Sequence, residues 1–215
     1  MKPLVSIIIP STHARREYNE AILNNFIQQT YIHKEVLFDF GEGCIGWKRN
    51  NLCKRAKGEL ILHFDDDDKY EKDWISKSVE ALLASESDIV GLSKLNMYDP
   101  VKDIAYQYFH NSTPVSFLSG ATLCYRKSYW ERNNFQNIQI GEDSVFMYDR
   151  GRQLAKIFDH GYVDGFLASI HSGNTSPRQL DNGFNYRMLN DFERDKIVER
   201  FFGSKVQRSD ETSLR

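Results

Sequence analysis

The sequence has few cysteines, no long apolar run and almost no net charge. Its three cysteines, Cys44, Cys53 and Cys124, are odd in number and show no Cys-x-x-Cys spacing, which argues against a disulfide framework and a structural zinc site. We therefore expect reduced thiols in a cytoplasmic protein. The formal net charge of −2 provides no overall basic field, and this argues against nucleic acid as a partner.

The apolar runs are all short. None approaches the roughly 18 to 20 residues that a helix needs to cross a bilayer, so we expect no membrane span. The segment from Pro3 to Pro10 is a β-branched run of strand length with no small-residue cleavage site. We interpret it as a first strand and not as a signal peptide.

The composition is that of an ordinary globular protein. The 215 residues are 40% hydrophobic and 27% charged, which is sufficient for one large domain with a full core. We expect this domain to cover residues 1–203, with a change of pattern between 1–93 and 94–203, and a polar tail over 204–215.

Residues 1–93 alternate short apolar runs with amphipathic helical patterns. This alternation is typical of βαβ units and a mainly parallel sheet. We predict strands at 4–9, 35–40, 59–64 and 88–92, with helices around 22–27, 47–57 and 72–84.

Residues 94–203 contain aromatic-rich extended pieces separated by polar turns, a pattern that favours antiparallel or mixed strands. The predicted elements are strands at 105–109, 117–125, 155–158 and 165–170, and helices at 127–133, from about 142, and at 184–202.

Four adjacent aspartates, Asp65, Asp66, Asp67 and Asp68, directly follow the third predicted strand. In an extended segment Asp65 and Asp67 would point to one face, and Asp66 and Asp68 to the other. Two carboxylates on one face suit a hard divalent ion that keeps positions open for phosphate oxygens. Ligands of open α/β sheets bind at such strand ends. Alternatively, the cluster is a solvated turn whose last aspartate caps the next helix.

Gly41, Gly43 and Gly46 match the Gly-x-Gly-x-x-Gly dinucleotide fingerprint, and Asp65 follows at the appropriate distance. A complete βα unit already precedes the motif, bulky Trp47 opens the following helix, and one ribose-binding acid would suffice where four occur. Alternatively, the glycines let a loop turn at positive φ.

Several segments together resemble the family 2 glycosyltransferases. The similarity covers roughly residues 3 to 178. The matching segments, in chain order, are Pro3 to Ser11, Lys48 to Asn50, Ala56 to Ile61, His63 to Asp68 as the Asp-x-Asp motif, and Gly141 to Phe146 as the acceptor-side Glu-Asp motif.

The resemblance implies a GT-A fold, which is a Rossmann-like α/β architecture with a mixed, mainly parallel sheet flanked by helices. It also implies a nucleotide-sugar donor, usually a UDP-sugar, bound by residues 1–93, an acceptor-side half over 94–203, and Mn²⁺ or Mg²⁺. Carried over by position, Asp39 would contact the base, Asp65 the ribose and Asp67 the metal, and the other donor-binding positions would be Pro10, Ser11 and Asp66. The usual acidic pair before Gly41 is Asp39-Phe40 here, which leaves base and donor identity open.

The departing diphosphate requires positive charge, which a bridging metal supplies as a Lewis acid. Asp67 is the first expected ligand. Lys48 and Arg49 begin a helix whose amides favour anions, and Arg178 follows a Ser/Thr-rich loop. We expect Arg49 and Arg178 to contact the donor, although each is equally consistent with a solvated surface charge.

The acceptor hydroxyl must lose a proton as it attacks, and this requires a carboxylate as general base. Asp143 is the first candidate and Glu142 the second, by virtue of the resemblance. From local sequence alone, both are equally consistent with first-turn acids of a helix. One base and an in-line attack predict inversion at the anomeric carbon.

Two histidines adjoin these motifs. His171 ends a predicted strand and begins a loop rich in hydrogen-bonding groups, where its imidazole is a candidate metal ligand or phosphate contact; alternatively it is structural. His63, inside the strand before the aspartates, is expected to be a core residue.

The sequence as a whole predicts an inverting, metal-dependent glycosyltransferase that moves a sugar from a nucleotide diphosphate sugar to a glycan or lipid-linked acceptor. A lipid-linked acceptor would bring peripheral contact with the inner membrane face, although no basic amphipathic helix supports it. The alternatives are a nucleotidyltransferase, an NAD-dependent oxidoreductase and a non-catalytic nucleotide-sugar-binding module. The sugar, the acceptor and the oligomeric state remain open.

Overall fold

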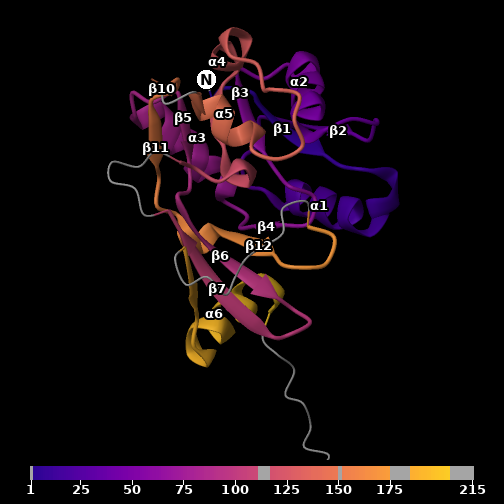
Figure 1. The fold of residues 1–215 in the computed structure, drawn as a ribbon, viewed down its shortest axis with the longest axis vertical. Coiled ribbons are helices and arrows are strands. Elements are labelled where there is room, and N and C mark those ends of the chain that lie inside the picture. The colour runs from indigo at the N-terminus through magenta and orange to yellow at the C-terminus, as the bar shows by residue number, and fades with distance from the viewer. Residues whose placement is uncertain (1, 111–116, 150–151, 175–184, 204–215) are drawn as a thin grey trace, which may run out of the picture.

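The computed structural model describes residues 2–110, 117–149, 152–174 and 185–203. They form two large sheets and a separate two-stranded pair, with helices packed around the large sheets (Figure 1). The predicted tail at 204–215 lies outside the described residues.

The first sheet has six strands in the order β11-β5-β8-β3-β1-β2. Strand β1 is parallel to both β2 and β3, and β11 is parallel to β5, whereas β8 runs antiparallel to β3 and to β5. The sheet is therefore mixed and mainly parallel, as predicted. The strands span Val5–Pro10 (β1), Lys34–Asp39 (β2), Leu60–His63 (β3), Ile89–Gly91 (β5), Cys124–Arg126 (β8) and Ile157–Asp159 (β11).

The second sheet, in the lower half of Figure 1, has the order β13-β7-β6-β12-β4. Its pairs are antiparallel except for β6 with β12, which confirms the mixed pattern predicted for the second half. The strands span Lys69–Tyr70 (β4), Lys94–Asp99 (β6), Ile104–Phe109 (β7), Phe166–Ser169 (β12) and Tyr186–Met188 (β13), and Tyr148–Asp149 (β9) pairs separately with Arg152–Gln153 (β10).

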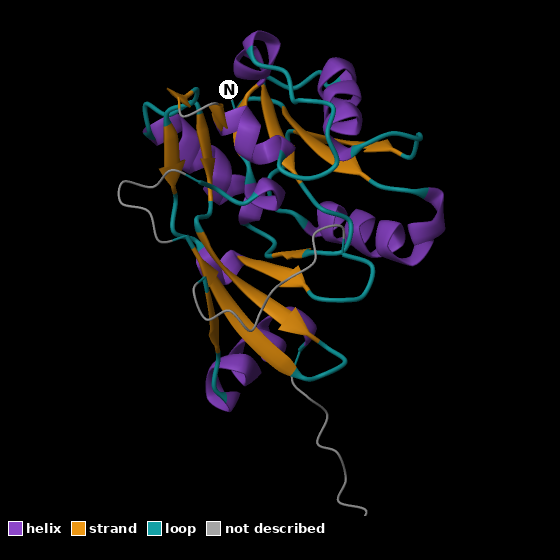
Figure 2. Ribbon diagram, in the orientation of Figure 1, coloured by secondary structure: helices purple, strands orange, loops and turns teal. Residues whose placement is uncertain are grey.

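Helices cover both faces of the first sheet, as Figure 2 shows. All six residues of β1 are buried, as expected for a strand with both faces covered. Ile7 packs in one core cluster with residues of α1 and α3, and Ile8 packs in another with residues of α2, α4 and α5. The helices span Arg16–Gln28 (α1), Ile45–Arg55 (α2), Trp74–Ala84 (α3), Lys127–Arg132 (α4), Glu142–Met147 (α5) and Asp191–Phe202 (α6).

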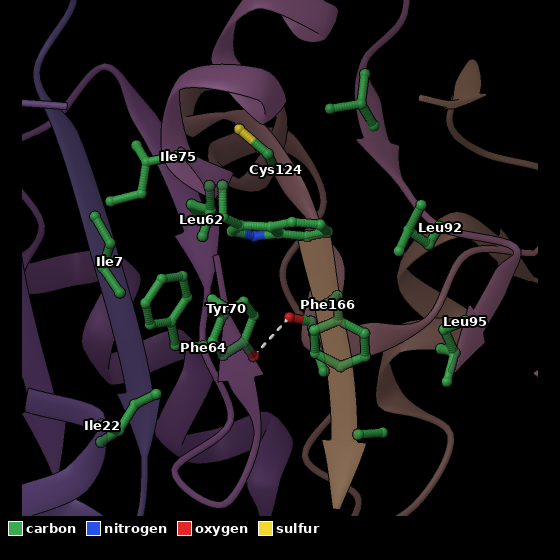
Figure 3. Packing of buried hydrophobic residues seen from close by; sticks show 14 of the residues in the cluster. Ile7, Ile22, Leu62, Phe64, Tyr70, Ile75, Leu92, Leu95, Cys124 and Phe166 are labelled. Carbon is green, nitrogen blue, oxygen red and sulfur yellow. Dashed lines mark hydrogen bonds between the residues drawn. The ribbon is translucent and has the colours of Figure 1, made fainter. Parts of the chain in front are cut away.

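An aromatic stack fixes the link between the two sheets. The rings of Phe64, after β3, and Tyr70, in β4, stack with centroids 3.8 Å apart, and Figure 3 shows them side by side near Phe166. The Tyr70 hydroxyl accepts a hydrogen bond from the Asp65 amide at 2.8 Å and donates to the Ala121 carbonyl at 3.1 Å. Since Phe64 and Tyr70 bracket the four aspartates, this contact determines where the acidic segment turns.

Two predicted elements differ from the structure. The strand predicted at 117–125 is replaced by a 3-10 turn, Gly120–Thr122, and the short strand β8, because Thr122 Oγ1 bonds to Ser119 O and accepts from the Leu92 amide. The helix predicted at 184–202 begins only at Asp191, where Asn190 and Glu193 form a capping box. The residues before it pair with β7 as β13.

No helix within the described residues is long and apolar enough to cross a membrane.

Two histidines, the buried His63 and the partly buried His160, keep their imidazoles neutral. His63 bonds to the Gly120 carbonyl and to the Tyr125 hydroxyl, which confirms it as a core residue, and burial lowers its pKa. Burial also lowers the pKa of His160 to about 4. His160 lies edge-on to Trp74, and its Nε2 is buried without a hydrogen-bond partner in the described parts of the chain.

We expect His160 to make the protein sensitive to acid. Below pH 6.5 the unfolded chain protonates this imidazole while the folded chain does not, so the free energy of unfolding falls by up to about 1.4 kcal/mol per pH unit until about pH 4. Urea unfolding of the wild type and of His160→Asn between pH 7 and 4.5 measures this loss. The variant should lose less stability on acidification, and equal losses would contradict the assignment.

Candidate active site

A cleft of about 370 Å³ opens at the carboxyl ends of β1 and β3. It brings together residues from both halves of the chain. Those of chemical interest are Pro10, Arg15, Arg49, Asp65, Asp66, Asp67, Asp68, Tyr108, Gly120, Glu142, Asp143, Asn174 and Tyr186.

The four aspartates form a turn, and the predicted alternation of their side chains between two faces was wrong. Asp66 and Asp67 both contact the same atom, Arg15 Nη2, at 3.0 and 2.6 Å. The Asp68 amide donates to the Asp65 carbonyl at 3.4 Å, and the chain returns directly into β4. An extended segment would separate adjacent side chains, whereas a turn lets them share one partner.

The alternative role of the cluster as a helix cap is also wrong. Helix α3 begins after Asp73, whose side chain makes no capping bond. Asp68 instead accepts a hydrogen bond from the Ser169 amide at 2.9 Å. The acidic turn is therefore tied to β12 of the second sheet and not to the helix that follows it.

Asp67 and His171, the two predicted metal ligands, lie side by side. His171 Nε2 is 2.8 Å from Asp67 Oδ2. The Gly173 amide donates to His171 Nδ1 at 3.0 Å, so the proton lies on Nε2, and ligation through Nε2 requires the other tautomer. Within the described residues no three His, Cys, Asp or Glu side chains form a metal cluster. The pair fits an ion that takes its remaining ligands from phosphate oxygens and water.

Arg49 joins the acidic turn to Glu142 at the start of α5. Its side chain is almost completely buried, Nη1 donates to Glu142 Oε1, and Nη2 lies 3.5 Å from Asp65 Oδ1. Burial opposes the charge of Arg49, but Glu142 and Asp65 outweigh it and raise the pKa of the guanidinium. Burial raises the pKa of Glu142 against the opposing effect of Arg49. Glu142 is thus held as the buried partner of a cation.

Asp143, the first candidate base, lies at the start of α5 and lines the cleft. Its Oδ1 accepts from the Ser144 amide at 2.7 Å. A Cβ at Gly120 would lie only 2.5 Å from Asp143 Oδ2, so the glycine is needed for this close approach. The neighbouring acids therefore differ: Glu142 points to Arg49, and Asp143 packs beside the Gly120 turn.

The first amides of α2 are unavailable to a phosphate. The Ile45 amide donates to the Gln139 side chain and the Gly46 amide to the Ile138 carbonyl, both at 3.2 Å. A Cβ at Gly46 would overlap the Gln136 carbonyl, so this glycine permits a close chain contact. The predicted anion-binding role of this helix start was wrong, because residues 136–139 cover it. A dinucleotide enzyme would bind its pyrophosphate at these amides, so the dinucleotide interpretation is disfavoured.

The predicted donor-binding residues lie along the ends of β1 and β2. Pro10 pairs with Asp39 in register, and the Ser11 amide donates to the Asp39 carbonyl at 3.0 Å. The Ser11 hydroxyl contacts the Asp66 carboxylate. Asp39 Oδ1 accepts from the Gly41 amide at 2.9 Å; Asp39 does not line the 370 Å³ cleft. Arg178 lies outside the described residues.

Comparison with known proteins identifies the family. The family model described as Glycosyl transferase family 2 matches residues 20–136, more than half of the chain. The chain belongs to glycosyl transferase family 2. This confirms the predicted resemblance and favours the glycosyltransferase interpretation over the dinucleotide enzyme and the nucleotidyltransferase.

Individual relatives of this family 2 domain are distant. The chain is 27% identical over 109 residues to the "Putative teichuronic acid biosynthesis glycosyltransferase TuaG" of Bacillus subtilis, a match that spans 38% of this chain and 43% of that protein. The matched part is thus less than half of the relative.

Solved structures establish the GT-A fold. The S. aureus TarS fragment 1–349 in complex with UDP-GlcNAc superposes with a TM-score of 0.59 at 18% identity, covering 92% of this chain and 71% of TarS 1–349. The mannosyltransferase PcManGT of Pyrobaculum calidifontis, in complex with GDP-Man and Mn²⁺, gives 0.54 at 15% identity, covering 83% and 59%.

Sequence reasoning missed Arg15 in this family 2 site. Arg15 ends the 3-10 turn His13–Arg15 and reaches the acidic turn, whereas Arg16 next to it pairs with Glu20 on the exposed side of α1. Two adjacent arginines at the start of a helix carry no sequence signal that distinguishes them. The orientation of the turn decides which one enters the cleft.

We expect Glu142→Gln to destabilise the protein through the buried ion pair. The change leaves the buried Arg49 without its closest ion-pair partner among the described residues, and removing one partner of such a pair costs about 3 kcal/mol. Urea unfolding at pH 7 measures the loss, with Glu20→Gln, which breaks an exposed pair, as the control. If both variants unfold alike, Arg49 and Glu142 do not stabilise the site.

Proposed function

We propose that this protein is an inverting, metal-dependent glycosyltransferase that moves a sugar from a UDP-sugar to a hydroxyl of a glycan or lipid-linked acceptor. The main support is that one cleft is lined by the acidic turn and by Asp143. The acidic turn supplies carboxylates for a divalent ion that would bind the nucleotide diphosphate. Asp143 supplies a base for the acceptor.

The donor would lie along the ends of β1, β2 and β3. We infer that Asp39 contacts the base, Asp65 the ribose, and Pro10 and Ser11 the adjoining nucleotide. TarS bound to UDP-GlcNAc and PcManGT bound to GDP-Man support a nucleotide diphosphate sugar as the donor class. Among the described residues Arg49 Nε is buried without a partner, and an oxygen of the donor would satisfy it. Arg178 remains a proposed diphosphate contact.

Asp67 would hold the divalent ion. His171 would join it through Nε2 once the proton moves to Nδ1 and the Gly173 amide releases that nitrogen. The PcManGT complex, which contains Mn²⁺, supports manganese as the first ion to test. When bound, such an ion acts as a Lewis acid on the diphosphate oxygens. The chain itself orients Asp67, because the His171 imidazole contacts its carboxylate and the Tyr70 hydroxyl holds the neighbouring Asp65 amide.

Asp143 would act as the general base. It accepts the proton of the acceptor hydroxyl as the hydroxyl oxygen bonds to the anomeric carbon, while the bond from that carbon to the diphosphate oxygen breaks and the electron pair leaves on the diphosphate. A single displacement of this kind inverts the anomeric configuration. Glu142 is a poorer base, because its carboxylate is already engaged by Arg49.

The acceptor would approach along the aromatic side of the cleft. Tyr108 and Tyr186 line it with ring centroids 5.3 Å apart, and tyrosine rings offer an apolar face with a polar edge to a sugar. The name of TuaG refers to teichuronic acid biosynthesis, which supports a glycan acceptor. A cytoplasmic location, at the inner membrane face for a lipid-linked acceptor, is part of this proposal.

We expect Asp143→Asn to abolish transfer without unfolding the protein. Loss of a general base lowers the rate by about 100- to 10,000-fold, whereas donor binding should persist because Asp143 lies on the acceptor side. Product formation and UDP binding by calorimetry measure the two effects, with NMR of the wild-type product testing inversion. Wild-type protein that binds UDP-sugars but never transfers would instead indicate a binding module.

We expect donor turnover to require a divalent ion and Asp67. Release of nucleoside diphosphate from UDP-GlcNAc, UDP-glucose and GDP-mannose is measured with Mn²⁺, with Mg²⁺ and with EDTA. Asp67→Asn should lower the rate at least about 100-fold, whereas Asp164→Asn, an exposed carboxylate near Arg200, should not. Undiminished turnover in EDTA would contradict the metal-dependent mechanism.

A further inference from the structure

Arg15 places a positive charge where the proposed function requires a metal ion. Its Nη2 lies 2.6 Å from Asp67 Oδ2 and 3.0 Å from Asp66 Oδ1. The same Asp67 oxygen is 2.8 Å from His171 Nε2. One carboxylate oxygen thus receives hydrogen bonds from both a guanidinium and an imidazole.

We propose that Arg15 is an exchangeable internal cation. Its guanidinium neutralises Asp67 until a divalent ion binds Asp67 Oδ2, and it then donates hydrogen bonds to the diphosphate of the donor. This inference rests on the proposed function. During the exchange Arg15 keeps its ion pair with Asp66, whose carboxylate also contacts the Ser11 hydroxyl. No bond is made or broken other than hydrogen bonds and metal coordination.

Competition follows from charge and space. A divalent ion on Asp67 Oδ2 would compete with Arg15 Nη2, which now donates to that oxygen at 2.6 Å, because two positive charges close to one oxygen repel each other. A guanidinium remains charged at all relevant pH values. The exchange is therefore one cation for another, and the acidic turn is compensated in both states.

The surroundings of Arg15 allow it to move. Its side chain is 24% exposed, against 4% for that of Arg49. The guanidinium lies over the Tyr18 ring, 4.9 Å from its centroid, and Tyr18 stacks on His171. A flat aromatic surface retains its attraction for a cation over a range of positions. Arg15 also lines the cleft, so a short rotation keeps it beside a bound diphosphate.

A manganese titration without nucleotide tests the competition. Free Mn²⁺ is followed by electron paramagnetic resonance in the wild type, Arg15→Gln and the matched control Arg16→Gln. Arg15→Gln should bind Mn²⁺ about tenfold more tightly, the size expected for one charge-assisted hydrogen bond. Arg16→Gln should match the wild type, because Arg16 contacts only Glu20 on the exposed side of its helix among its described ion pairs.

A second titration tests the contact with the diphosphate. At saturating Mn²⁺, calorimetry should show UDP binding to Arg15→Gln about tenfold more weakly than to the wild type, with uridine binding unchanged. The UDP affinity of Arg15→Lys, which keeps the charge but offers a single point of contact, should lie between those of Arg15→Gln and the wild type. This variant also provides the test if Arg15→Gln does not fold.

The direction of the manganese effect decides the outcome. Unchanged or weaker Mn²⁺ binding by the Arg15 variants would show that Arg15 only stabilises the turn, and this would overturn the inference. Tighter Mn²⁺ binding with unchanged UDP affinity would overturn the diphosphate contact. If wild-type transfer depends on Mn²⁺ in either case, the proposed function stands and only this inference fails. If neither the wild type nor any variant binds Mn²⁺ in the presence of UDP, the proposed function and this inference are both wrong.

Discussion

Compensation of negative charge is the constraint on which this structure depends. Asp65, Asp66, Asp67, Glu142 and Asp143 all line one cleft, and such a concentration of carboxylates is unstable without cations. Two arginines provide them in different ways. Arg49 is buried and engages Glu142, whereas Arg15 is partly exposed and reaches Asp66 and Asp67. The first contact lies inside the fold, whereas the second lies at the surface of the cleft, where the proposed exchange with a divalent ion requires it.

The buried pair also connects parts of the chain that are far apart in sequence. Arg49 and Glu142 are 93 residues apart, and residues 136–139 bond to the first amides of α2. The segment that presents Asp143 is thus docked on the helix that supplies Arg49. The two sides of the cleft therefore share one buried contact, and the adjacent acids Glu142 and Asp143 have different surroundings.

A small number of aromatic contacts in the core determine where the acidic turn lies in the cleft. Phe64 and Tyr70, which precede and follow the acidic turn in the sequence, stack on each other, and the Tyr70 hydroxyl bonds to the Asp65 amide. Strand β1 lies between two helical layers with every residue buried. Because these elements are packed in the core, the turn keeps the aspartates close together in spite of their mutual repulsion.

The sequence by itself determined the alternation of strands and helices, the mixed sheet, the family and the location of the acidic cluster, because periodicity and short motifs are local properties. Only the tertiary structure decided that Asp66 and Asp67 share one partner, that Glu142 faces Arg49 while Asp143 lines the cleft, that Arg15 and not Arg16 enters the site, and that β13 precedes α6. Each of these depends on contacts between segments distant in sequence, and no local pattern encodes which side chain a distant segment will meet.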